Sequence, residues 1–239
     1  MMNRIIESEL LDHLLSTDPD AITSRNDLQR LNFFMGNATI LLQAWNRSFN
    51  KITLKEGPLQ IIELGAGDGT LLLKLARQLQ SQSPHKITAD VTFIDRHNVI
   101  SQETIDAFKE LHWSIKIVTM DLFLWLEQSP LISADVILAN LFLHHFNDQE
   151  LKTLFQHLAL KTNLFLACEP RRNLLALMSS KLLWLLNANT VTQHDAPVSV
   201  RAGFTDKELS QHWPAGPEWH LREQCAIPFC HSFIAQRNA

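Results

Sequence analysis

The sequence predicts an α/β fold in which a parallel sheet is covered by helices on both faces. Three observations lead to this prediction. Short, continuous apolar runs alternate with helical patterns from residue 57 onward, a glycine-rich loop joins the first apolar run to the first helix, and two closely spaced apolar runs end the chain. Strands of a parallel sheet are buried on both faces and are therefore apolar along their whole length, whereas strands with one solvated face alternate.

The expected elements follow in order along the chain. The apolar runs predict strands at 59–64, 91–94, 114–118, 135–139 and 163–167. Helical spacing predicts helices at 70–80, 101–111, 148–160 and 173–186, the second of them capped by Ser101. Thr205 is expected to begin a short helix, and runs at 219–223 and 229–235 predict a terminal antiparallel strand pair.

The first 56 residues have a different character. Leucines recur at helical spacing between residues 10 and 15 and again from Leu28, and Asp18-Pro19-Asp20 divides the two pieces. Gly57-Pro58 then marks a turn. We therefore divide the chain into an N-terminal helical cap, residues 1–56, and an α/β domain, residues 57–239.

Composition and charge argue against several classes of partner. Of the 239 residues, 46% are hydrophobic and 19% charged, and the net charge is −4. No run of Lys or Arg supplies the basic surface that nucleic-acid phosphates require, so no nucleic-acid partner is expected. The three cysteines form no CxxC pair, and no element carries a set of side chains at metal-ligand spacing, so neither disulfides nor a metal site is expected.

The sequence shows neither a membrane span nor a targeting segment. Its most apolar stretch, 173–188, contains Lys181 and is shorter than the roughly 20 residues that a bilayer requires. The N-terminal segment is amphipathic and acidic, unlike a signal peptide. We expect a cytoplasmic protein without integral membrane association, in which the helix at 173–186 could pair with a second subunit.

The loop Glu63-Leu64-Gly65-Ala66-Gly67-Asp68-Gly69 is the strongest functional signal. Three of the seven glycines fall in this loop, directly after a strand and directly before a helix. Glycine accepts positive φ and lets a ligand approach the backbone. The helix behind the loop offers unpaired N–H groups at its N-terminus. The arrangement predicts a site for an adenosine-containing cofactor.

Two cofactors fit such a loop, a nicotinamide dinucleotide and S-adenosylmethionine. The dinucleotide pattern GxGxxG has Thr70 in place of its last glycine here. The carboxylate of Glu63 would repel a pyrophosphate but suits an ammonium and a sulfonium group. The chain contains no tyrosine, so the Tyr-Lys proton donor of short-chain dehydrogenases is absent. These observations favour S-adenosylmethionine.

Polar residues follow the next three strands at the same edge of the sheet. Asp95 ends the second strand and is expected at the ribose hydroxyls. Asp121 follows the third strand, where it could accept the adenine amino proton, cap the helix at 122–128, or do both. Asn140 follows the fourth strand and is expected to face the ligand crevice. No Asn-Pro-Pro-aromatic motif follows, which argues against methylation of an adenine or glutamine nitrogen.

Together, ELGAGDG, Asp95, Asp121-Leu122 and the segment 140–146 resemble the class I S-adenosylmethionine-dependent methyltransferases, especially small-molecule members of the quinone-biosynthesis and natural-product types. Residues 169–171 and 191–204 look like a subfamily of bacterial biosynthetic methyltransferases. The resemblance implies a Rossmann-like seven-stranded sheet of order 3-2-1-4-5-7-6 with strand 7 antiparallel. The expected cofactor contacts are Glu63, Gly65, Gly67, Asp95, Arg96, Asp121, Leu122, Asn140 and Leu141.

The acceptor side is less defined by the sequence. His144 and His145 lie just beyond the fourth strand, where one of them could deprotonate or orient an acceptor hydroxyl. The remaining candidates for substrate contacts are Phe33 and Asn37 in the cap, His194 beside Asp195, and Arg201. We expect methyl transfer to a small lipophilic or aromatic acceptor, at oxygen or else at carbon. A protein or RNA methyltransferase, or a non-catalytic cofactor-binding partner protein, is the alternative.

Overall fold

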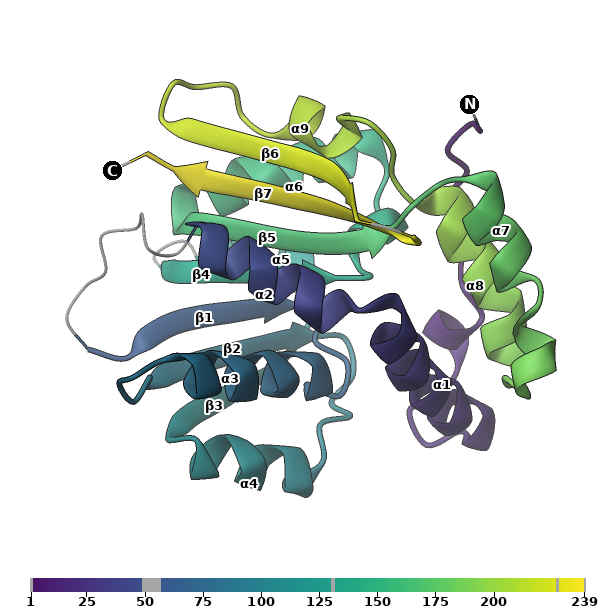
Figure 1. Ribbon diagram of the computed structural model, residues 1–239, viewed down its shortest axis with the longest axis horizontal. Helices are drawn as coiled ribbons and strands as arrows, with labels where there is room; N and C mark the ends of the chain where they lie inside the picture. Colours follow the sequence, from purple (N-terminus) through teal and green to yellow (C-terminus); the bar gives the residue numbers. More distant parts are fainter. Residues whose placement is uncertain (1, 49–56, 130–131, 227, 239) are drawn as a thin grey trace.

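The sheet of this computed structural model, which describes residues 2–48, 57–129, 132–226 and 228–238, has the predicted architecture (Figure 1). Seven strands pair in the order β3-β2-β1-β4-β5-β7-β6, and β7 runs antiparallel to both of its neighbours. The strands are β1 Leu59–Leu64, β2 Ala89–Asp95, β3 Trp113–Thr119, β4 Ala134–Asn140, β5 Thr162–Pro170, β6 Trp219–Ala226 and β7 Cys230–Arg237. The predicted fold class is therefore confirmed.

Helices cover both faces of the sheet, each above its own hydrophobic core. One face carries α2 Asn37–Ser48, α3 Thr70–Gln82 and α4 Gln102–Glu110, and the other carries α5 Leu122–Gln128, α6 Asp148–Lys161 and α9 Glu208–His212. Trp45 and Leu72 belong to the first core, and Trp125 and Phe155 to the second. The central strand β4 is buried at six consecutive positions, as its continuous apolar sequence predicts.

Local sequence signals set where several helices begin and end. Ser101 caps α4 as predicted, since its side chain accepts a hydrogen bond from the Thr104 N–H. Asn147 and Glu150 form a reciprocal capping box at the start of α6. Helix α1, Pro19–Met35, ends at Gly36, which adopts the left-handed conformation at φ 73°.

The remaining helices gather at the carboxyl ends of the parallel strands (Figure 1). They are α1, α7 Leu174–Ser180 and α8 Thr190–Ala202, with short 3₁₀ turns η1 Leu11–His13, η3 Leu143–His145 and η4 Leu183–Leu186. None of the helices in the described part of the chain is long and apolar enough to cross a membrane. The amino-terminal residues 2–12, which we call the N-terminal strap, contact the end of α8 through the Ile5 N–H and the turn η3 through Arg4.

One expectation for this region was wrong in detail, and one helix of this region was not predicted. The predicted helix 173–186 is divided into α7 and η4, with Lys181 at the end of α7. Helix α8 was not predicted, because Pro197 lies inside it and interrupts the sequence pattern. A proline removes one backbone N–H from a helix, but the buried position of Pro197 allows packing to outweigh that loss.

Candidate cofactor and acceptor site

A cavity of about 770 Å³ opens at the carboxyl ends of the central strands. Its floor is the glycine loop after β1 together with residues that follow β2, β3 and β4. Its walls come from the N-terminal strap, from α1 and from Ser199 of α8. The cavity thus lies at the edge where open α/β sheets bind ligands.

The glycine loop has a backbone that L side chains rarely adopt. Gly65, Gly67 and Gly69 have φ values of 63°, 53° and 72°. A Cβ at Gly65 would come within 2.2 Å of the Phe142 ring, whereas a Cβ at Gly67 would meet nothing within 4 Å. Gly65 is therefore required by packing, and Gly67 leaves the backbone open toward the cavity.

Asp95 fixes the shape of this loop. Its Oδ2 accepts a hydrogen bond from the Gly67 N–H at 2.8 Å, and its Oδ1 accepts one from the His97 N–H at 2.9 Å. Both residues that it holds line the cavity, as does Asp95 itself. The side chain expected at the cofactor ribose is thus also part of the scaffold of the glycine loop.

Glu63 is a buried carboxylate at the cavity with an unmet hydrogen-bonding need. The residue is 3% exposed, and its Oε2 has no hydrogen-bond partner among the described residues. Burial raises the pKa of Glu63 well above its ordinary value, and the negative charges of Asp68 and Asp95 raise it further. A cationic group in the cavity would relieve both the repulsion and the missing hydrogen bond.

Asp121 caps a helix and binds a neighbouring arginine. Its Oδ1 accepts a hydrogen bond from the Phe123 N–H at 2.9 Å, at the start of α5, and its Oδ2 accepts one from Arg96 at 2.8 Å. Burial opposes ionisation, but Arg96 and the backbone N–H groups outweigh it and lower the pKa of Asp121. The capping role considered for Asp121 is present, and Arg96, Asp121 and Leu122 all line the cavity.

Asn140 and Leu141 occupy the end of β4. The Oδ1 of Asn140 accepts a hydrogen bond from Asn37 at 2.9 Å, and its Nδ2 donates to Asn32 at 3.3 Å. Leu141 has a φ of 49°, an uncommon conformation for a branched side chain, and its N–H donates to the Cys168 carbonyl. Such strained positions concentrate at functional sites.

His144 is buried between two carboxylates. Its Nδ1 lies 2.9 Å from Glu169 Oε2, and its Nε2 lies 3.3 Å from Glu9 Oε1. Burial alone would lower the pKa of His144, but the hydrogen bonds and charges of Glu169 and Glu9 raise it to about 9. Burial likewise opposes ionisation of Glu9, yet the contact with His144 lowers the pKa of Glu9 to about 2. His144 is therefore a charged imidazolium at neutral pH.

His145 has the opposite electrostatic environment. Its ring centre lies 4.3 Å from that of His144, and its side chain is 26% exposed at the cavity. Burial and the positive charge of His144 lower the pKa of His145, although Glu9 and Asp12 act in the other direction. The nearest carboxylate oxygen to its Nδ1 is that of Asp12, at 3.6 Å. At neutral pH, His145 is therefore the neutral imidazole of the pair.

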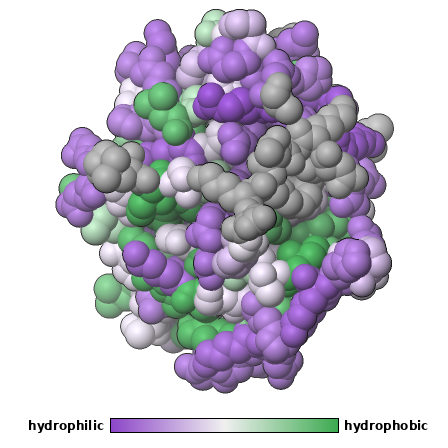
Figure 2. All heavy atoms as spheres, turned by 90° about the vertical axis from the view of Figure 1, so that its left-hand side faces the viewer, coloured by the Kyte–Doolittle hydropathy of each residue, from purple (hydrophilic) through white to green (hydrophobic). Residues whose placement is uncertain are grey.

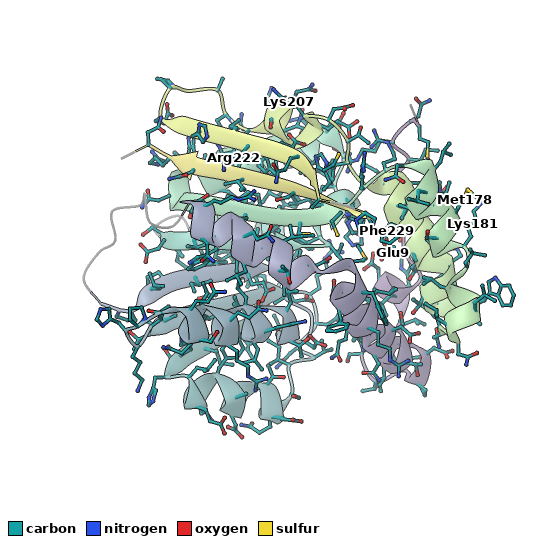
Figure 3. All side chains as sticks on the ribbon, in the orientation of Figure 1. Glu9, Met178, Lys181, Lys207, Arg222 and Phe229 are labelled. Carbon is teal, nitrogen blue, oxygen red and sulfur yellow. The ribbon has the colours of Figure 1, made fainter. Side chains whose placement is uncertain are left out.

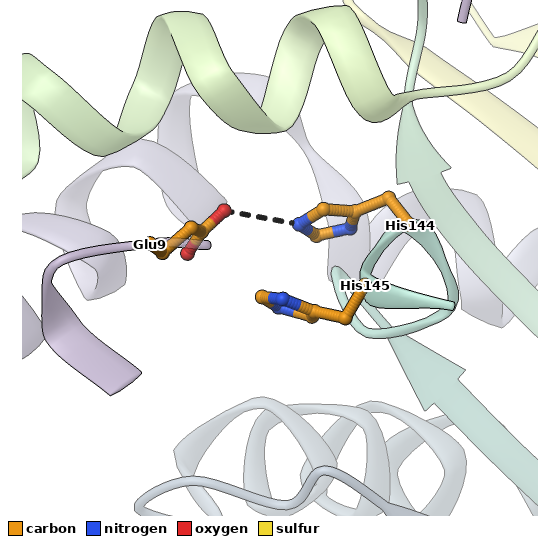
Figure 4. A group of neighbouring side chains, drawn as sticks. All are labelled: Glu9, His144 and His145. Carbon is orange, nitrogen blue, oxygen red and sulfur yellow. Dashed lines mark hydrogen bonds and ion pairs between the residues drawn. The ribbon is translucent and has the colours of Figure 1, made fainter. Parts of the chain in front are cut away.

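Glu9, His144 and His145 form a compact group built from two distant parts of the chain (Figure 4). One atom of metal-ligating type from each residue lies within 4.8 Å of the others. Spacing along a single element could not reveal this group, because Glu9 is in the N-terminal strap. Each ring nitrogen of the charged His144 faces a carboxylate, Nδ1 that of Glu169 and Nε2 that of Glu9. A metal cation could bind a ring nitrogen of His144 only by displacing the proton on it.

The four residues considered for substrate binding do not line the cavity. Phe33 is 66% exposed, and its ring lies under Lys74 on the surface. Asn37 is fully buried and bonded to Asn32 and Asn140. His194 contacts Asp195 at 2.8 Å, and Arg201 forms an ion pair with Glu7. Asn37, His194 and Arg201 thus contact neighbouring parts of the chain, and Phe33 lies on the surface. The sequence pattern could not show which of these side chains face the cavity.

Two carboxylates near the histidines, one buried and one partly buried, were not recognised from the sequence. Glu169, at the end of β5, is 0% exposed and accepts hydrogen bonds from the backbone N–H groups of Phe142 and Leu143 as well as from His144. Glu9 reaches His144 from the N-terminal strap and also accepts a hydrogen bond from Ser199. For Glu169 the sequence offered one signal, a glutamate at the end of an apolar strand, and for Glu9 it offered none.

Comparison with solved structures identifies proteins of similar architecture. A magnesium protoporphyrin IX methyltransferase from Synechocystis PCC 6803, with bound S-adenosylhomocysteine, has a TM-score of 0.50 and 16% identity over 86% of this chain and 83% of its own. An O-methyltransferase family protein from Burkholderia thailandensis has a TM-score of 0.56 and 18% identity over 94% of this chain. A putative O-methyltransferase from Nostoc punctiforme PCC 73102 has a TM-score of 0.57 and 12% identity over 98%.

The chain spans 64% of the length of each of the latter two proteins. No protein-family model and no curated protein sequence matches it. At these identities the likeness concerns architecture, and it agrees with the strand order and the antiparallel β7. The chain therefore has the fold of the class I S-adenosylmethionine-dependent methyltransferases.

Proposed function

We propose that this chain transfers the methyl group of S-adenosylmethionine to a hydroxyl group of a small lipophilic or aromatic acceptor, as a cytoplasmic enzyme of biosynthesis. The observation that carries the proposal is a shared cavity. The glycine loop with Glu63 forms one part of its lining, and His144 with His145 forms another. The loop proposed for the adenosine cofactor and the histidines proposed for proton removal therefore line the same space.

Two features of the cavity fit this cofactor. The unpaired, buried Oε2 of Glu63 suits the ammonium group of the methionine moiety, which would supply the missing hydrogen bond and offset the nearby negative charges. Gly67 leaves its backbone uncovered where the nucleoside would lie. When bound, S-adenosylmethionine supplies an electrophilic methyl group on its sulfonium.

The other lining residues take the roles that their positions allow. Asp95 holds the glycine loop and offers its carboxylate to the ribose hydroxyls, and Gly65 lets the loop pack on Phe142. Asp121 and Leu122 would contact the adenine, with Arg96 fixing the carboxylate of Asp121. Asn140 and Leu141, at the end of β4, complete the set of cofactor contacts.

We assign proton removal to His145. A general base must be unprotonated at the working pH and must face the acceptor. His145 meets both conditions, because its pKa is lowered and its side chain lines the cavity. His144 is charged and hydrogen-bonded on both ring nitrogens, so it cannot accept a further proton. We infer that His144 positions its neighbour and holds the N-terminal strap through Glu9.

The acceptor side of the cavity contains a group of aromatic rings and aliphatic side chains among polar residues of the N-terminal strap and α1. The Phe142 and Phe146 rings meet edge to face at 5.1 Å, and Phe123 meets Phe146 in the same way at 5.5 Å. Leu11 of the N-terminal strap and Leu28 of α1 add aliphatic surface. Residues 1–56 would then act as the cap of the acceptor pocket. This lining supports a lipophilic or aromatic acceptor, which such walls bury favourably.

A methyl-transfer assay tests the proposal. The protein is incubated with S-adenosylmethionine labelled in its methyl group and with a panel of phenols and long-chain hydroxy compounds, and label in the organic phase is counted. We expect transfer to at least one phenolic class, and a loss of at least a hundredfold in His145→Gln. The matched control is His220→Gln, which changes an exposed histidine on β6. Transfer that is equal in His145→Gln and wild type would refute the base assignment.

A further inference from the structure

The surface formed by α7 and η4 is unusually apolar for an exposed part of a protein. Seven large hydrophobic side chains within 13 consecutive residues are more than half exposed: Leu174, Leu175, Met178, Leu182, Trp184, Leu185 and Leu186. We call these seven residues the apolar ridge. Single exposed leucines are ordinary, whereas a contiguous set of this kind marks a surface that binds something.

Packing within the chain does not account for the ridge. The segment already has a buried face, formed by Ala176, Ser180 and Leu183, and α7 packs on α8. The ridge lies on the remaining, outward sides of the segment. A surface helix of a globular protein would carry polar residues there. The outward apolar side chains therefore serve contact with something outside the described chain.

The ridge occupies the end of the molecule that holds the cavity. Helices α7 and α8 stand at the carboxyl ends of the strands, and Met178 and Lys181 point away from the protein body (Figures 1 and 3). Helix α8, on which α7 packs, contributes Ser199 to the cavity wall. The opposite end of the molecule, outside its grey atoms, is mainly hydrophilic with scattered hydrophobic side chains (Figure 2).

The charge of this segment differs from that of the whole chain. The chain has a net charge of −4, yet no Asp or Glu occurs between Glu169 and Asp195. The same stretch contains the partly exposed Arg171, which precedes the Asn173 cap of α7 by two residues, and the exposed Lys181 within the ridge. The single charge within the ridge is thus positive, and an acidic side chain near this segment, Asp20 of α1, is hydrogen-bonded to Asn189 beyond the end of the ridge. An apolar surface with a positive charge at its centre is complementary to the acyl region and the anionic headgroups of a lipid bilayer.

We propose that the apolar ridge docks this protein onto the surface of an anionic phospholipid bilayer. The ridge would enter the headgroup–acyl boundary, and the long side chain of Lys181 would reach back to the phosphates. The segment is too short to span the bilayer, so the contact is peripheral. This inference does not rest on the proposed methyl transfer, although it would place the cavity near lipophilic molecules.

The position of Lys181 favours a bilayer over a second copy of the chain. In a twofold dimer formed through the ridge, the same patch faces itself, so both Lys181 ammonium groups would enter an apolar interface to which this segment brings no carboxylate. Desolvating two like charges is unfavourable. At a membrane surface each lysine meets a phosphate instead. Charge complementarity thus points to lipid.

Vesicle co-sedimentation tests the proposal without any enzymatic readout. The full chain is mixed with vesicles of phosphatidylcholine alone and of phosphatidylcholine with phosphatidylglycerol, and the bound fraction is measured across lipid concentrations. We expect binding that is strongest with phosphatidylglycerol, and at least a tenfold loss of partitioning in Leu185→Glu. The matched control is Leu160→Glu, because Leu160 is 84% exposed on α6, outside the ridge. Far-UV circular dichroism verifies that both variants are folded.

Two results would overturn the proposal. The first is the absence of sedimentation with either vesicle type, together with a dimer in light scattering that Leu185→Glu dissociates, since the ridge would then be a subunit interface. The second is vesicle binding that Leu185→Glu and Leu160→Glu weaken equally, which would place the lipid contact elsewhere. Neither result would bear on methyl transfer, so the two proposals can fail separately.

Discussion

The Nδ1 atom of His144 lies 2.9 Å from the Oε2 atom of Glu169, and both side chains are buried. Glu169 also accepts hydrogen bonds from the backbone N–H groups of Phe142 and Leu143. Together these contacts join the 3₁₀ turn after β4 to the end of β5. The contact with Glu169 keeps the His144 ring positively charged, its centre 4.3 Å from that of the His145 ring. The neutrality of His145 at physiological pH is therefore a property of the fold around its neighbour.

The first prediction concerns stability and pH. The pKa of His144 is about 9, above the 6.5 expected in the unfolded chain, so its stabilising contribution is complete below pH 6.5 and is lost as pH rises through 9. At about 1.4 kcal/mol per pKa unit, the loss is on the order of 3 kcal/mol. Urea unfolding of wild type at pH 6.5 and 9.5 should show this fall in unfolding free energy.

The matched variant for that experiment is His144→Gln, in which the titrating group is absent. Its unfolding free energy should be lower than that of wild type at pH 6.5, and the gap should narrow by pH 9.5. At the acid end, the pKa of Glu9 is about 2, so the contribution of Glu9 is present above pH 4.5 and declines as pH falls through 2. A gap between wild type and His144→Gln that stays constant from pH 6.5 to 9.5 would contradict the buried imidazolium.

The second prediction separates the roles of the two histidines. In His145→Gln, turnover should fall by about 10²-fold or more, the range that general-base catalysis supplies. The affinity for S-adenosylmethionine should change less than twofold, because the role proposed for His145 concerns the acceptor. Single-turnover rates and calorimetric titration measure the two quantities. An affinity that falls in parallel with turnover would show that His145 belongs to the cofactor site instead.

The third prediction concerns Glu63. In Glu63→Gln the carboxylate that we propose for the cofactor ammonium is lost. Hydrogen bonds to charged groups contribute about 1.5–3 kcal/mol, so affinity for S-adenosylmethionine should fall about 10- to 100-fold. Because burial raises the pKa of the free Glu63 carboxyl, binding in wild type should also weaken as pH falls. The control is Glu103→Gln on exposed α4 surface. Equal affinities in the two variants would remove Glu63 from the site.

The fourth prediction concerns the support beneath the cavity. Asn37 is fully buried, and its Nδ2 donates to Asn32 at 2.8 Å and to Asn140 at 2.9 Å. Asn37→Ala leaves buried polar groups unpaired and should destabilise the protein by about 1–3 kcal/mol in urea unfolding. Asn46→Ala, at an exposed position on the same helix α2, should cost less than about 0.5 kcal/mol. Similar losses in both variants would show that the Asn37 network is not stabilising.

The fold was largely predictable because its signals are local. The glycine loop, the apolar strand 135–139 and the cap at Ser101 each depend on a few adjacent residues, and each is present as expected. Where distant packing decides the outcome, the sequence pattern misleads. Helix α8 forms across Pro197, since the buried positions of that helix outweigh one missing N–H.

The site, too, was predictable only where the signals are local. The cofactor candidates lie at or just after the ends of parallel strands, where open α/β sheets bind ligands, and all nine of them line one cavity. The acceptor candidates depended on guessing which side chains of the cap face inward, and Phe33 instead lies on the surface. Glu9 could not be found from the sequence, because 135 positions separate it from His144 and no local pattern marks it.

Calorimetric titration of the protein with S-adenosylmethionine and with NADH tests the central claim most directly. It is repeated on Gly67→Arg, which would fill the open side of the loop, and on Gly36→Arg, which imposes the same left-handed backbone strain outside the cavity. We predict that wild type and Gly36→Arg bind S-adenosylmethionine and not NADH, and that Gly67→Arg binds neither. Binding of NADH instead, or S-adenosylmethionine binding unchanged in Gly67→Arg, would contradict the assignment of this cavity.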